Sequence, residues 1–345
     1  MNNYIQYSLY LILSLLLCLG ILSCQNKKQA VADDEPQLAG VVFDEDSAIA
    51  YCAKQCDFGP RTMNSAAHDE CEEWIISKFQ QYGCEVITQK ADLKGWDGTM
   101  LHSTNIIART NPDAKERIII CAHWDCRPWA DNDPDENNHR TPVMATNDGA
   151  SGVAVMLELA RILNVNPSTS NPQSQALNLG IDFVCFDAED CGTPSWSGKQ
   201  DEDSWALGAQ HFAKNIQQLY AANDKPKFGI LLDMVGGQGA KFYQEGLSKH
   251  YAQDLVNSVW QAANEAGYGS YFTGQSGGYI TDDHKPLNEA GIPTIDIIPY
   301  YPDCEASAFG PTWHTVLDDM NHIDKNTLKA VGQTLVQFLF TIHNS

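Results

Sequence analysis

The chain is 345 residues long and carries 22 Lys and Arg against 44 Asp and Glu, which gives a formal net charge of −22. Nucleic acid is therefore excluded as an expected partner, because binding to a phosphate backbone requires a basic face. With 43% hydrophobic and 10% aromatic residues, the chain can bury a sizeable core and is not a disordered acidic segment.

The N-terminal 24 residues predict an export signal. They contain no charged side chain, and their apolar run at residues 9–23 is shorter than the roughly 20 residues that span a bilayer. Residues 21–24, Ile-Leu-Ser-Cys, resemble a bacterial lipoprotein box, which implies cleavage before Cys24 and lipidation of its thiol. The alternative is an uncleaved N-terminal anchor. Both place the protein in the bacterial cell envelope, periplasmic or facing the outer membrane, with membrane contact only through this anchor.

The rest of the chain divides into a tether and a folded body. Residues 25–42 are polar and show no apolar pattern, which is typical of a tether between an anchor and a domain. No linker rich in Pro, Gly or Ser interrupts the pattern that follows. We therefore expect a single α/β domain over residues 43–345.

The cysteines leave one question open. Nine of the eleven follow Cys24, and none forms a CxxC pair, so a zinc knuckle built from thiolates is not expected. In an oxidising compartment some of them could pair. The nearest neighbours in sequence are Cys52 with Cys56 and Cys185 with Cys191.

Helical and strand-like patterns alternate along the body. In chain order we expect helices at 47–57 and 65–82, strands at 84–89, 103–109 and 117–123, a helix at 149–163, a strand at 179–186, a helix at 204–216, a strand at 227–233, a helix at 248–266, a strand at 292–298 and a helix at 324–342. The last four strand segments are apolar nearly throughout, which is typical of strands covered on both faces. The alternation predicts a mostly parallel sheet sandwiched between helices.

Polar residues collect where these strands end, which is where ligands bind in an open α/β sheet. The candidates are His123 and Asp125, Asp148 at the start of a helix, Glu189 and Asp190, Asp233, and His314 after the last strand. Taken singly, Asp148 is explained as a helix N-cap and a lone His as a satisfied polar residue. Together they predict a metal site with nitrogen and oxygen ligands, which suits zinc better than calcium or magnesium.

Two pairs in this set have predicted roles. Asp125, two residues after His123, can accept the second imidazole N–H and fix the tautomer. Consecutive residues that leave a strand point in different directions, so one of Glu189 and Asp190 can bind the metal while the other carries a proton.

A resemblance to a known superfamily rests on the motifs HWD, TNDGASG, FDAED, LLD, DDHKP and WHT, in this order within residues 46–343. They resemble the zinc-dependent aminopeptidases and glutaminyl cyclases. The resemblance implies a zinc exopeptidase fold, phosphorylase/hydrolase-like, with a mixed sheet whose edge strands are antiparallel. The aminopeptidases hold two zincs, and the ligands implied here are His123, Asp148, Asp190, Asp233 and His314. The cyclases hold one zinc, for which Asp148, Asp190 and His314 are implied, and Glu189 is the implied general base.

Fewer residues distinguish the two branches. The motif DDHKP begins with one acid more than is usual in the aminopeptidases, and this acid, Asp282, resembles a cyclase aspartate that shares a proton network with the base and Asp233. Phe309 and Trp313 resemble the aromatic wall beside the cyclase zinc, and Trp196 resembles a further pocket tryptophan. The ordinary alternatives are core or surface aromatics and a solvated loop acid.

Two positions depart from the superfamily pattern. Asp190 stands where Glu is more common, so the shorter side chain requires a shifted backbone or a shifted metal. Asp296 stands where the family has a histidine, and an acid there needs a partner.

The resemblance implies a glutaminyl-peptide cyclotransferase with one zinc per chain, which converts the N-terminal Gln of peptides or proteins to pyroglutamate and releases ammonia. The alternative is an aminopeptidase with two zincs, since all five ligands are present. A non-catalytic binding ectodomain is the third possibility, although such a protein is expected to have lost ligands. We expect a monomer whose partners are peptides or proteins with N-terminal Gln.

Overall fold

The computed structural model describes residues 38–163, 177, 179–199, 201–221 and 224–343. The predicted signal peptide, including Cys24, and residues 25–37 of the predicted tether lie outside these ranges. Residues 38–42 belong to the folded body, because the Ala39 N–H donates to Gln337 Oε1 at 2.7 Å and Val41 is buried in the core. None of the helices in the described ranges is long and apolar enough to cross a membrane.

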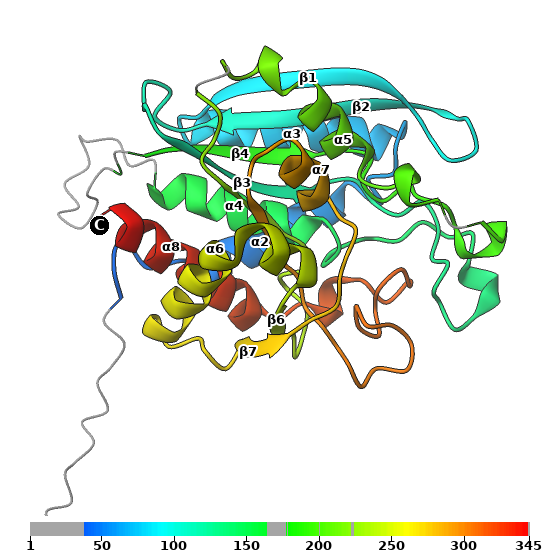
Figure 1. Ribbon diagram of the computed structural model, residues 1–345. Coiled ribbons are helices and arrows are strands. Elements are labelled where there is room, and N and C mark those ends of the chain that lie inside the picture. The colour runs from blue at the N-terminus through cyan, green and yellow to red at the C-terminus, as the bar shows by residue number, and fades with distance from the viewer. Residues whose placement is uncertain (1–37, 164–176, 178, 200, 222–223, 344–345) are drawn as a thin grey trace, which may run out of the picture. The chain divides into compact units, whose positions relative to one another are not determined.

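A six-stranded mixed sheet runs through the body in the order β1-β2-β4-β3-β5-β8 (Figure 1). Its strands are β1 (Glu85–Lys94), β2 (Met100–Arg109), β3 (Arg117–His123), β4 (Gly180–Phe186), β5 (Gly229–Leu232) and β8 (Thr294–Ile297). The neighbours among β4, β3, β5 and β8 pair in parallel, whereas β1 pairs with β2 and β2 with β4 in antiparallel fashion. The prediction of a mostly parallel sheet with an antiparallel edge is confirmed.

Helices cover both faces of this sheet (Figure 1). One face carries α2 (Glu45–Asp57), α3 (Ala66–Gln81), α4 (Ala150–Leu163), α6 (Gly246–Glu265) and α8 (Lys325–His343), and the other carries α5 (Leu207–Lys214) and α7 (His284–Glu289). Short 3-10 helices lie in the connections: η1 (Glu136–Asn138), η2 (Ser195–Ser197), η3 (Glu202–Ser204), η4 (Ile216–Gln218) and η5 (Met320–His322). Each predicted helix and strand is present, with ends displaced by a few residues.

Three elements were not predicted from the sequence. α7 has six residues and contains Pro286, so it is too short to show a helical period. The strands β6 (Phe242–Gln244) and β7 (Phe272–Ser276) form a separate parallel pair. Their length of three and five residues gives no alternating signal to detect.

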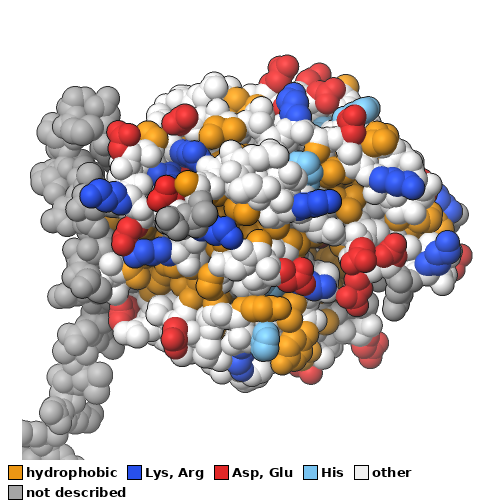
Figure 2. Space-filling view, turned by 45° about the horizontal axis from the view of Figure 1, so that its top comes forward, with side chains coloured by type: hydrophobic (Ala, Val, Ile, Leu, Met, Phe, Trp, Pro, Cys, Tyr) orange, Lys and Arg blue, Asp and Glu red, His pale blue; other side chains and the backbone are white. Residues whose placement is uncertain are grey.

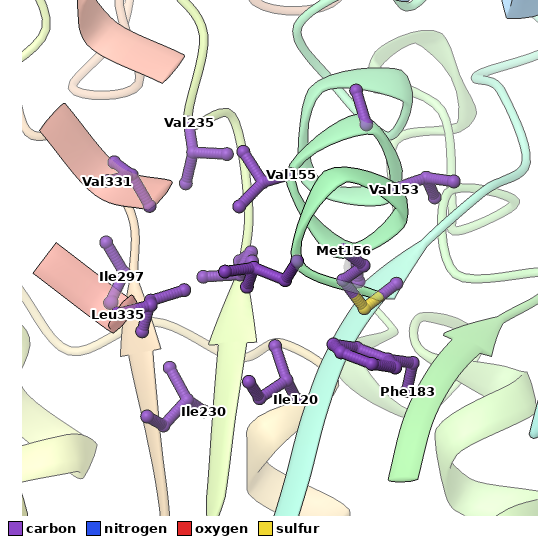
Figure 3. Packing of buried hydrophobic residues seen from close by; sticks show 14 of the residues in the cluster. Ile120, Val153, Val155, Met156, Phe183, Ile230, Val235, Ile297, Val331 and Leu335 are labelled. Atoms are coloured by element: carbon purple, nitrogen blue, oxygen red, sulfur yellow. The ribbon is translucent and has the colours of Figure 1, made fainter. Parts of the chain in front are cut away.

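The buried strands contribute side chains to two hydrophobic cores, one on each face of the sheet, because successive side chains point to opposite faces. In β3, Ile118 and Ile120 belong to the larger cluster, whereas Ile119 and Cys121 belong to the cluster beneath α5 and α7. Figure 3 shows the larger core, in which α4 and α8 lie against the strands. Its labelled residues are Ile120, Phe183, Ile230 and Ile297 from the strands, Val153, Val155 and Met156 from α4, Val331 and Leu335 from α8, and Val235. This packing on both faces holds the carboxyl ends of the parallel strands at one edge.

All nine cysteines of the described residues are free thiols. Neither Cys52 with Cys56 nor Cys185 with Cys191 forms a disulfide. Burial raises the pKa of the Cys121 thiol well above its ordinary value, so this cysteine does not supply a thiolate nucleophile.

Candidate active site

The carboxyl ends of three adjacent strands supply most of the predicted site residues. His123 is the last residue of β3, Asp233 follows β5 directly, and Glu189 and Asp190 lie three and four residues after the end of β4. Asp148 precedes α4 by two residues. The sequence prediction that these side chains gather at one edge of the sheet therefore agrees with the geometry.

Two groups of side chains could each hold a metal ion, and they share Asp148. One consists of His123, Asp148 and Asp233, and the other of Asp148, Asp190 and His314, with the ligand atoms of each group within 4.8 Å of one another. Asp148 Oδ1 lies 3.0 Å from His123 Nε2, and Asp148 Oδ2 lies 3.7 Å from His314 Nε2. The two oxygens of one carboxylate thus face the two histidines.

The donor atoms fit a zinc ion. Both carboxylate oxygens of Asp190 and Oδ1 of Asp233 are buried and have no hydrogen-bond donor. His314 Nε2 lies 3.1 Å from Asp190 Oδ1, and His123 Nε2 lies 3.4 Å from Asp233 Oδ1. A buried carboxylate without a partner is costly, whereas zinc binds this combination of imidazole nitrogen and carboxylate oxygen.

At three positions of the site the backbone adopts a conformation that residues other than glycine rarely adopt. Ala188, Met234 and His314 have φ angles of 54°, 48° and 54°, in the left-handed region that is unfavourable for residues other than Gly. Gly149 has φ +105°, and a Cβ there would lie 2.9 Å from the Asp125 carbonyl oxygen. Glycine at this position lets the Asp148 loop approach β3.

Asp125 holds the backbone of the two adjacent acids and lies beside His123. Its carboxylate accepts the backbone N–H groups of Glu189 and Asp190, each at 3.1 Å. Its Oδ1 also lies 3.5 Å from His123 Nδ1. At this distance His123 Nδ1 has no hydrogen-bond partner, so the predicted bond from His123 to Asp125 is not formed in the structure. Asp125 has a role that the sequence did not indicate, which is to fix the backbone of Glu189 and Asp190.

Sequence reasoning missed Arg127 and Asp131, which support the Asp190–His314 pair. Arg127 donates to both oxygens of Asp131, at 3.0 and 2.8 Å, and to the carbonyl oxygens of Asp190 and Gly192 at 3.2 and 3.0 Å. Asp131 Oδ1 lies 3.5 Å from His314 Nδ1. Burial acts to raise the pKa of Asp131, but His314 and Arg127 outweigh it and hold that pKa below its ordinary value.

A second missed acid, Asp318, fixes the loop of the shared ligand. Its carboxylate accepts the backbone N–H groups of Asn147 and Asp148 at 2.7 and 3.0 Å. Burial and the nearby Asp148 charge raise the pKa of Asp318 to about 7. Asp318 is separated from Asp148 by 170 residues, so no local pattern connects them.

A cavity of about 270 Å³ joins most of the predicted residues. Its lining includes Asp148, Glu189, Asp190, Asp233, Asp282, Phe309, Trp313 and His314. The His314 ring stacks on Trp313 with 3.8 Å between centroids, and Trp313 lies 4.8 Å from Phe309. The predicted ligands of a single zinc, the predicted base and the two residues of the aromatic wall therefore surround one small space, whereas His123 is not part of its lining.

The structure places Trp196 outside this cavity, contrary to expectation. Trp196 packs against Trp129 at 5.7 Å and beneath the Arg140 guanidinium at 3.8 Å. Trp205 lines the cavity instead, with its ring parallel to that of His314 at 6.0 Å and the Arg127 guanidinium 4.6 Å above it. Arg127, which is distant in sequence, supports the tryptophan that faces the site.

Burial shifts the pKa of the candidate base. Burial, together with the charges of Asp190 and Asp282 and against the effect of His123, raises the pKa of Glu189 well above its ordinary value. A carboxylate with a raised pKa accepts and returns a proton near neutral pH more readily. Asp282 lines the same cavity.

Asp296 has no partner for its side chain. It is 1% exposed, and neither carboxyl oxygen has a hydrogen-bond donor. Burial, with the charges of Asp282 and Asp233, raises the pKa of Asp296 well above its ordinary value. The surroundings of the acid that replaces the family histidine therefore disfavour its charged form.

Comparison with known proteins identifies the relatives of this chain. The model of peptidase family M28 matches residues 105–339. Aminopeptidase YwaD of Bacillus subtilis is 28% identical over 268 residues, which cover 74% of this chain and 49% of that protein. The glutaminyl-peptide cyclotransferase of Boiga irregularis is 28% identical over 255 residues, covering 70% of this chain and 66% of that protein. The chain thus spans about half of the first relative and just under two thirds of the second.

Solved structures resemble the chain over nearly their whole length. The Bacteroides thetaiotaomicron glutaminyl cyclase bound to N-acetylhistamine has a TM-score of 0.80 and 47% identity, covering 87% of this chain and 99% of that one. A leucine aminopeptidase precursor from the same organism has a TM-score of 0.79 and 46% identity, covering 88% and 99%. The Tannerella forsythia glutaminyl cyclase has a TM-score of 0.81 and 44% identity, covering 87% and 99%.

Proposed function

Because the chain belongs to peptidase family M28, we propose that it is a zinc-dependent glutaminyl-peptide cyclotransferase. It converts the N-terminal Gln of a peptide to pyroglutamate and releases ammonia. The observation that carries this proposal is the cavity of about 270 Å³, which surrounds one metal-ligand group, Glu189 and Asp282 with three aromatic side chains. Such a space suits one uncharged side chain better than an extended peptide. The similarity to glutaminyl cyclases at 44–47% identity supports the same activity.

The residues have distinct proposed roles. Asp148, Asp190 and His314 hold one zinc, which when bound supplies Lewis-acid polarisation of the substrate γ-carbonyl group. Glu189 accepts a proton from the α-amino group, whose nitrogen attacks the carbonyl carbon of the γ-carboxamide and closes a five-membered ring. Glu189 then returns the proton to the departing amide nitrogen, which leaves as ammonia.

The remaining lining residues bind and orient the substrate. Phe309, Trp313 and Trp205 cover the aliphatic part of the Gln side chain and exclude water from the reacting atoms. Asp282 stabilises the departing amide group of the Gln side chain while that group is protonated. If the protein is a cyclase, Asp282→Ala is expected to reduce ammonia release strongly, because this role is lost. An aminopeptidase would be less affected, because Asp282 has this role only in the cyclase reaction.

An aminopeptidase with two zincs is the second candidate, and one observation favours it. The group His123, Asp148 and Asp233 is complete beside the first group, so a second metal has a full set of ligands. The two candidates differ in metal content and in product.

One experiment separates these candidates. The soluble form, residues 25–345, is incubated with one peptide that begins with Gln and one that begins with Leu, and zinc is measured on the same preparation. Loss of one ammonia from the Gln peptide with about one zinc per chain supports the cyclase. Release of free Leu with about two zincs per chain contradicts it and supports the aminopeptidase.

We also propose that the protein is exported to the bacterial cell envelope and anchored by a lipid on Cys24. The support is the uncharged apolar N-terminal sequence that ends at Cys24. Full-length protein is expected to partition into detergent and a Cys24→Ser variant into the aqueous phase, and equal partition would contradict lipidation. We expect the soluble form to be a monomer, which light scattering on a size-exclusion column tests.

A further inference from the structure

A second, larger chamber opens from the candidate active site. Its volume is about 1140 Å³, against about 270 Å³ for the inner cavity. The two spaces share the lining residues Glu202, Trp205, Phe309, Trp313 and His314. If the N-terminal Gln occupies the inner cavity, the residues that follow it in the peptide enter the outer chamber.

Tyr279 is the distinctive side chain of the outer chamber. It is 79% exposed, and among the exposed large hydrophobic side chains of the described ranges it alone lines either of these two spaces. A large apolar side chain exposed at a cavity mouth is typical of a binding surface.

The ring of Tyr279 rests on the backbone of Gly246. A Cβ added at Gly246 would lie 2.7 to 2.8 Å from the Cγ, Cδ1 and Cδ2 atoms of this ring. Three atoms of one ring at nearly equal distance mean that the ring lies face-on over the glycine. One face of the Tyr279 ring is therefore supported, which leaves the opposite face for a ligand.

Hydrogen bonds hold the loop that carries Tyr279. The Gly246 N–H donates to the Gly278 carbonyl oxygen at 2.7 Å, and the Gly277 N–H donates to the Gln244 carbonyl oxygen at 2.8 Å. The Ile280 N–H donates to the buried Glu245 carboxylate at 3.0 Å. A ring held in this way loses little conformational freedom when a ligand binds to it.

We propose that Tyr279 is the platform for the side chain of the second substrate residue, and that this subsite prefers an aromatic side chain. The proposal rests on the cyclotransferase function and names its substrates as peptides with an aromatic residue after N-terminal Gln. The charged side chains Lys199, Asp201 and Glu202 in this lining are exposed and of mixed sign, so they give no comparable preference for a charged residue.

The test compares selectivity within each protein variant, so that a general change in activity cancels. Ammonia release is measured for the peptide amides Gln-Phe-Ala, Gln-Lys-Ala and Gln-Ala-Ala. In the wild type, kcat/KM for the Phe peptide is expected to exceed that for the Ala peptide by about fivefold, as one aromatic pair provides. The ratio is expected to approach one in Tyr279→Ala and to persist in Tyr279→Phe.

Two further variants separate the platform from other effects. Gly246→Ala introduces the Cβ that collides with the ring, so it is expected to lower the ratio while Tyr279 remains. Tyr251→Ala is the matched control, because Tyr251 is 42% exposed but lines neither space, and it is expected to keep the wild-type ratio.

The outcomes that overturn the proposal are distinct. A ratio that is the same in wild type and Tyr279→Ala contradicts the platform and leaves the cyclase function standing. A wild type that prefers the Lys peptide contradicts the aromatic preference. A wild type that releases ammonia from none of the three peptides contradicts the proposed function and, with it, the platform.

Discussion

Glu189 lies among buried carboxyl groups, and this crowding determines its chemistry. Asp190 is its neighbour in sequence, and Asp282 lines the same cavity. With Asp125 bound to its backbone N–H, the position of Glu189 does not depend on its own side-chain charge. The base can therefore be changed without moving the ligand beside it.

Glu189→Gln is the corresponding prediction. The amide keeps the shape of the side chain but cannot accept a proton, so turnover is expected to fall by about 10²–10⁴-fold while zinc content stays at the wild-type value. Activity on the Gln peptide and metal content are measured on one preparation. A variant that retains cyclisation would show that another residue is the base.

Substitution of Arg127 tests whether zinc binding by Asp190 and His314 depends on the residues that support them. Arg127→Lys removes the paired donation to Asp131 and the contacts with the Asp190 and Gly192 carbonyl oxygens, since a single ammonium cannot reproduce the planar fork. Zinc affinity, measured by competition with a chelator, is expected to fall by about 10–100-fold.

Arg117→Lys is the matched control for this variant. Arg117 also pairs with a buried acid, Asp182, but at the opposite end of β3. It is expected to leave zinc affinity unchanged even if it lowers stability. Equal zinc affinity in wild type and Arg127→Lys would contradict the supporting role.

For single residues, the sequence predicted the side chains proposed to contact the metal and the substrate better than the residues that support those side chains. Asp148 and Asp190 occur in short motifs next to a helix start and a strand end, and His314 occurs in the short motif WHT, all of which are local signals. Asp318 acts on Asp148 across 170 residues, and Trp205, which lines the cavity in place of Trp196, packs against the distant Arg127. These contacts depend on packing between segments that are far apart in the sequence, and the spacing of residues along the chain does not predict such packing.

Among the elements, α6 joins the two parts of the proposed substrate site. Glu245 is its N-cap and accepts the N–H groups of Leu247, Ser248 and Ile280. The same carboxylate thus fixes the start of α6 and the loop before Asp282. Neither α7 nor the β6–β7 pair around this loop was predicted, because each is too short to show a period.

Glu245 predicts a pH dependence of stability. Burial acts to raise its pKa, but His284 at 3.3 Å and the backbone donors outweigh burial and lower the pKa to about 2 from an ordinary value of 4.5. The folded state therefore favours the ionised form. The stability this gives, on the order of 3 kcal/mol, is complete above pH about 4.5 and is lost as the pH falls toward about 2.

The measurement compares wild type with Glu245→Gln. The difference in the free energy of unfolding between the two, from urea titrations, is expected to be largest at neutral pH and to shrink through this acidic range. Ser258→Ala, at an exposed position of the same helix that does not contact Glu245, serves as a control that keeps the carboxylate. A difference that does not change with pH would contradict the assigned ionisation.

For the whole molecule, the metal is expected to contribute to the stability of the fold. The two ligand groups collect Asp148, Asp190 and Asp233 with His123 and His314 at one edge of the sheet, and the chain carries a net charge of −22. Figure 2 shows acidic and basic side chains interspersed over one face. The buried acids contact His123, His314 and Arg127, and a bound cation would compensate the rest of their negative charge.

Removal of zinc is therefore expected to lower the unfolding temperature by roughly 5–10 °C, because a ligand that binds only the folded state stabilises it by mass action. Thermal unfolding is followed before and after a chelator, and after addition of zinc or calcium. Zinc is expected to restore the temperature, and calcium is not, because it prefers oxygen ligands alone. An unfolding temperature that the chelator does not change would contradict a stabilising metal.

The overall architecture was predictable where it depends on local pattern. The four apolar runs that became β4, β3, β5 and β8 indicated a parallel sheet covered on both faces, and helices found on either side confirm it. The packing of residues 38–42 against α8 was not predicted, because this short apolar run, Leu-Ala-Gly-Val-Val, follows a polar segment and shows no helical or strand period. Only the contacts of Ala39 and Val41 with a helix some 290 residues later reveal it.

Because the cysteines are free, the chain must fold before its thiols are oxidised. Seven of the nine thiols in the described ranges are buried in the fold, and Cys56 and Cys304 remain partly accessible. Before the chain folds, every thiol is open to oxidants and to pairing with the others. In an oxidising compartment, rapid folding rather than a covalent framework protects the chain, and a mutation that slows folding would be harmful through mispaired cysteines far from the site of the change.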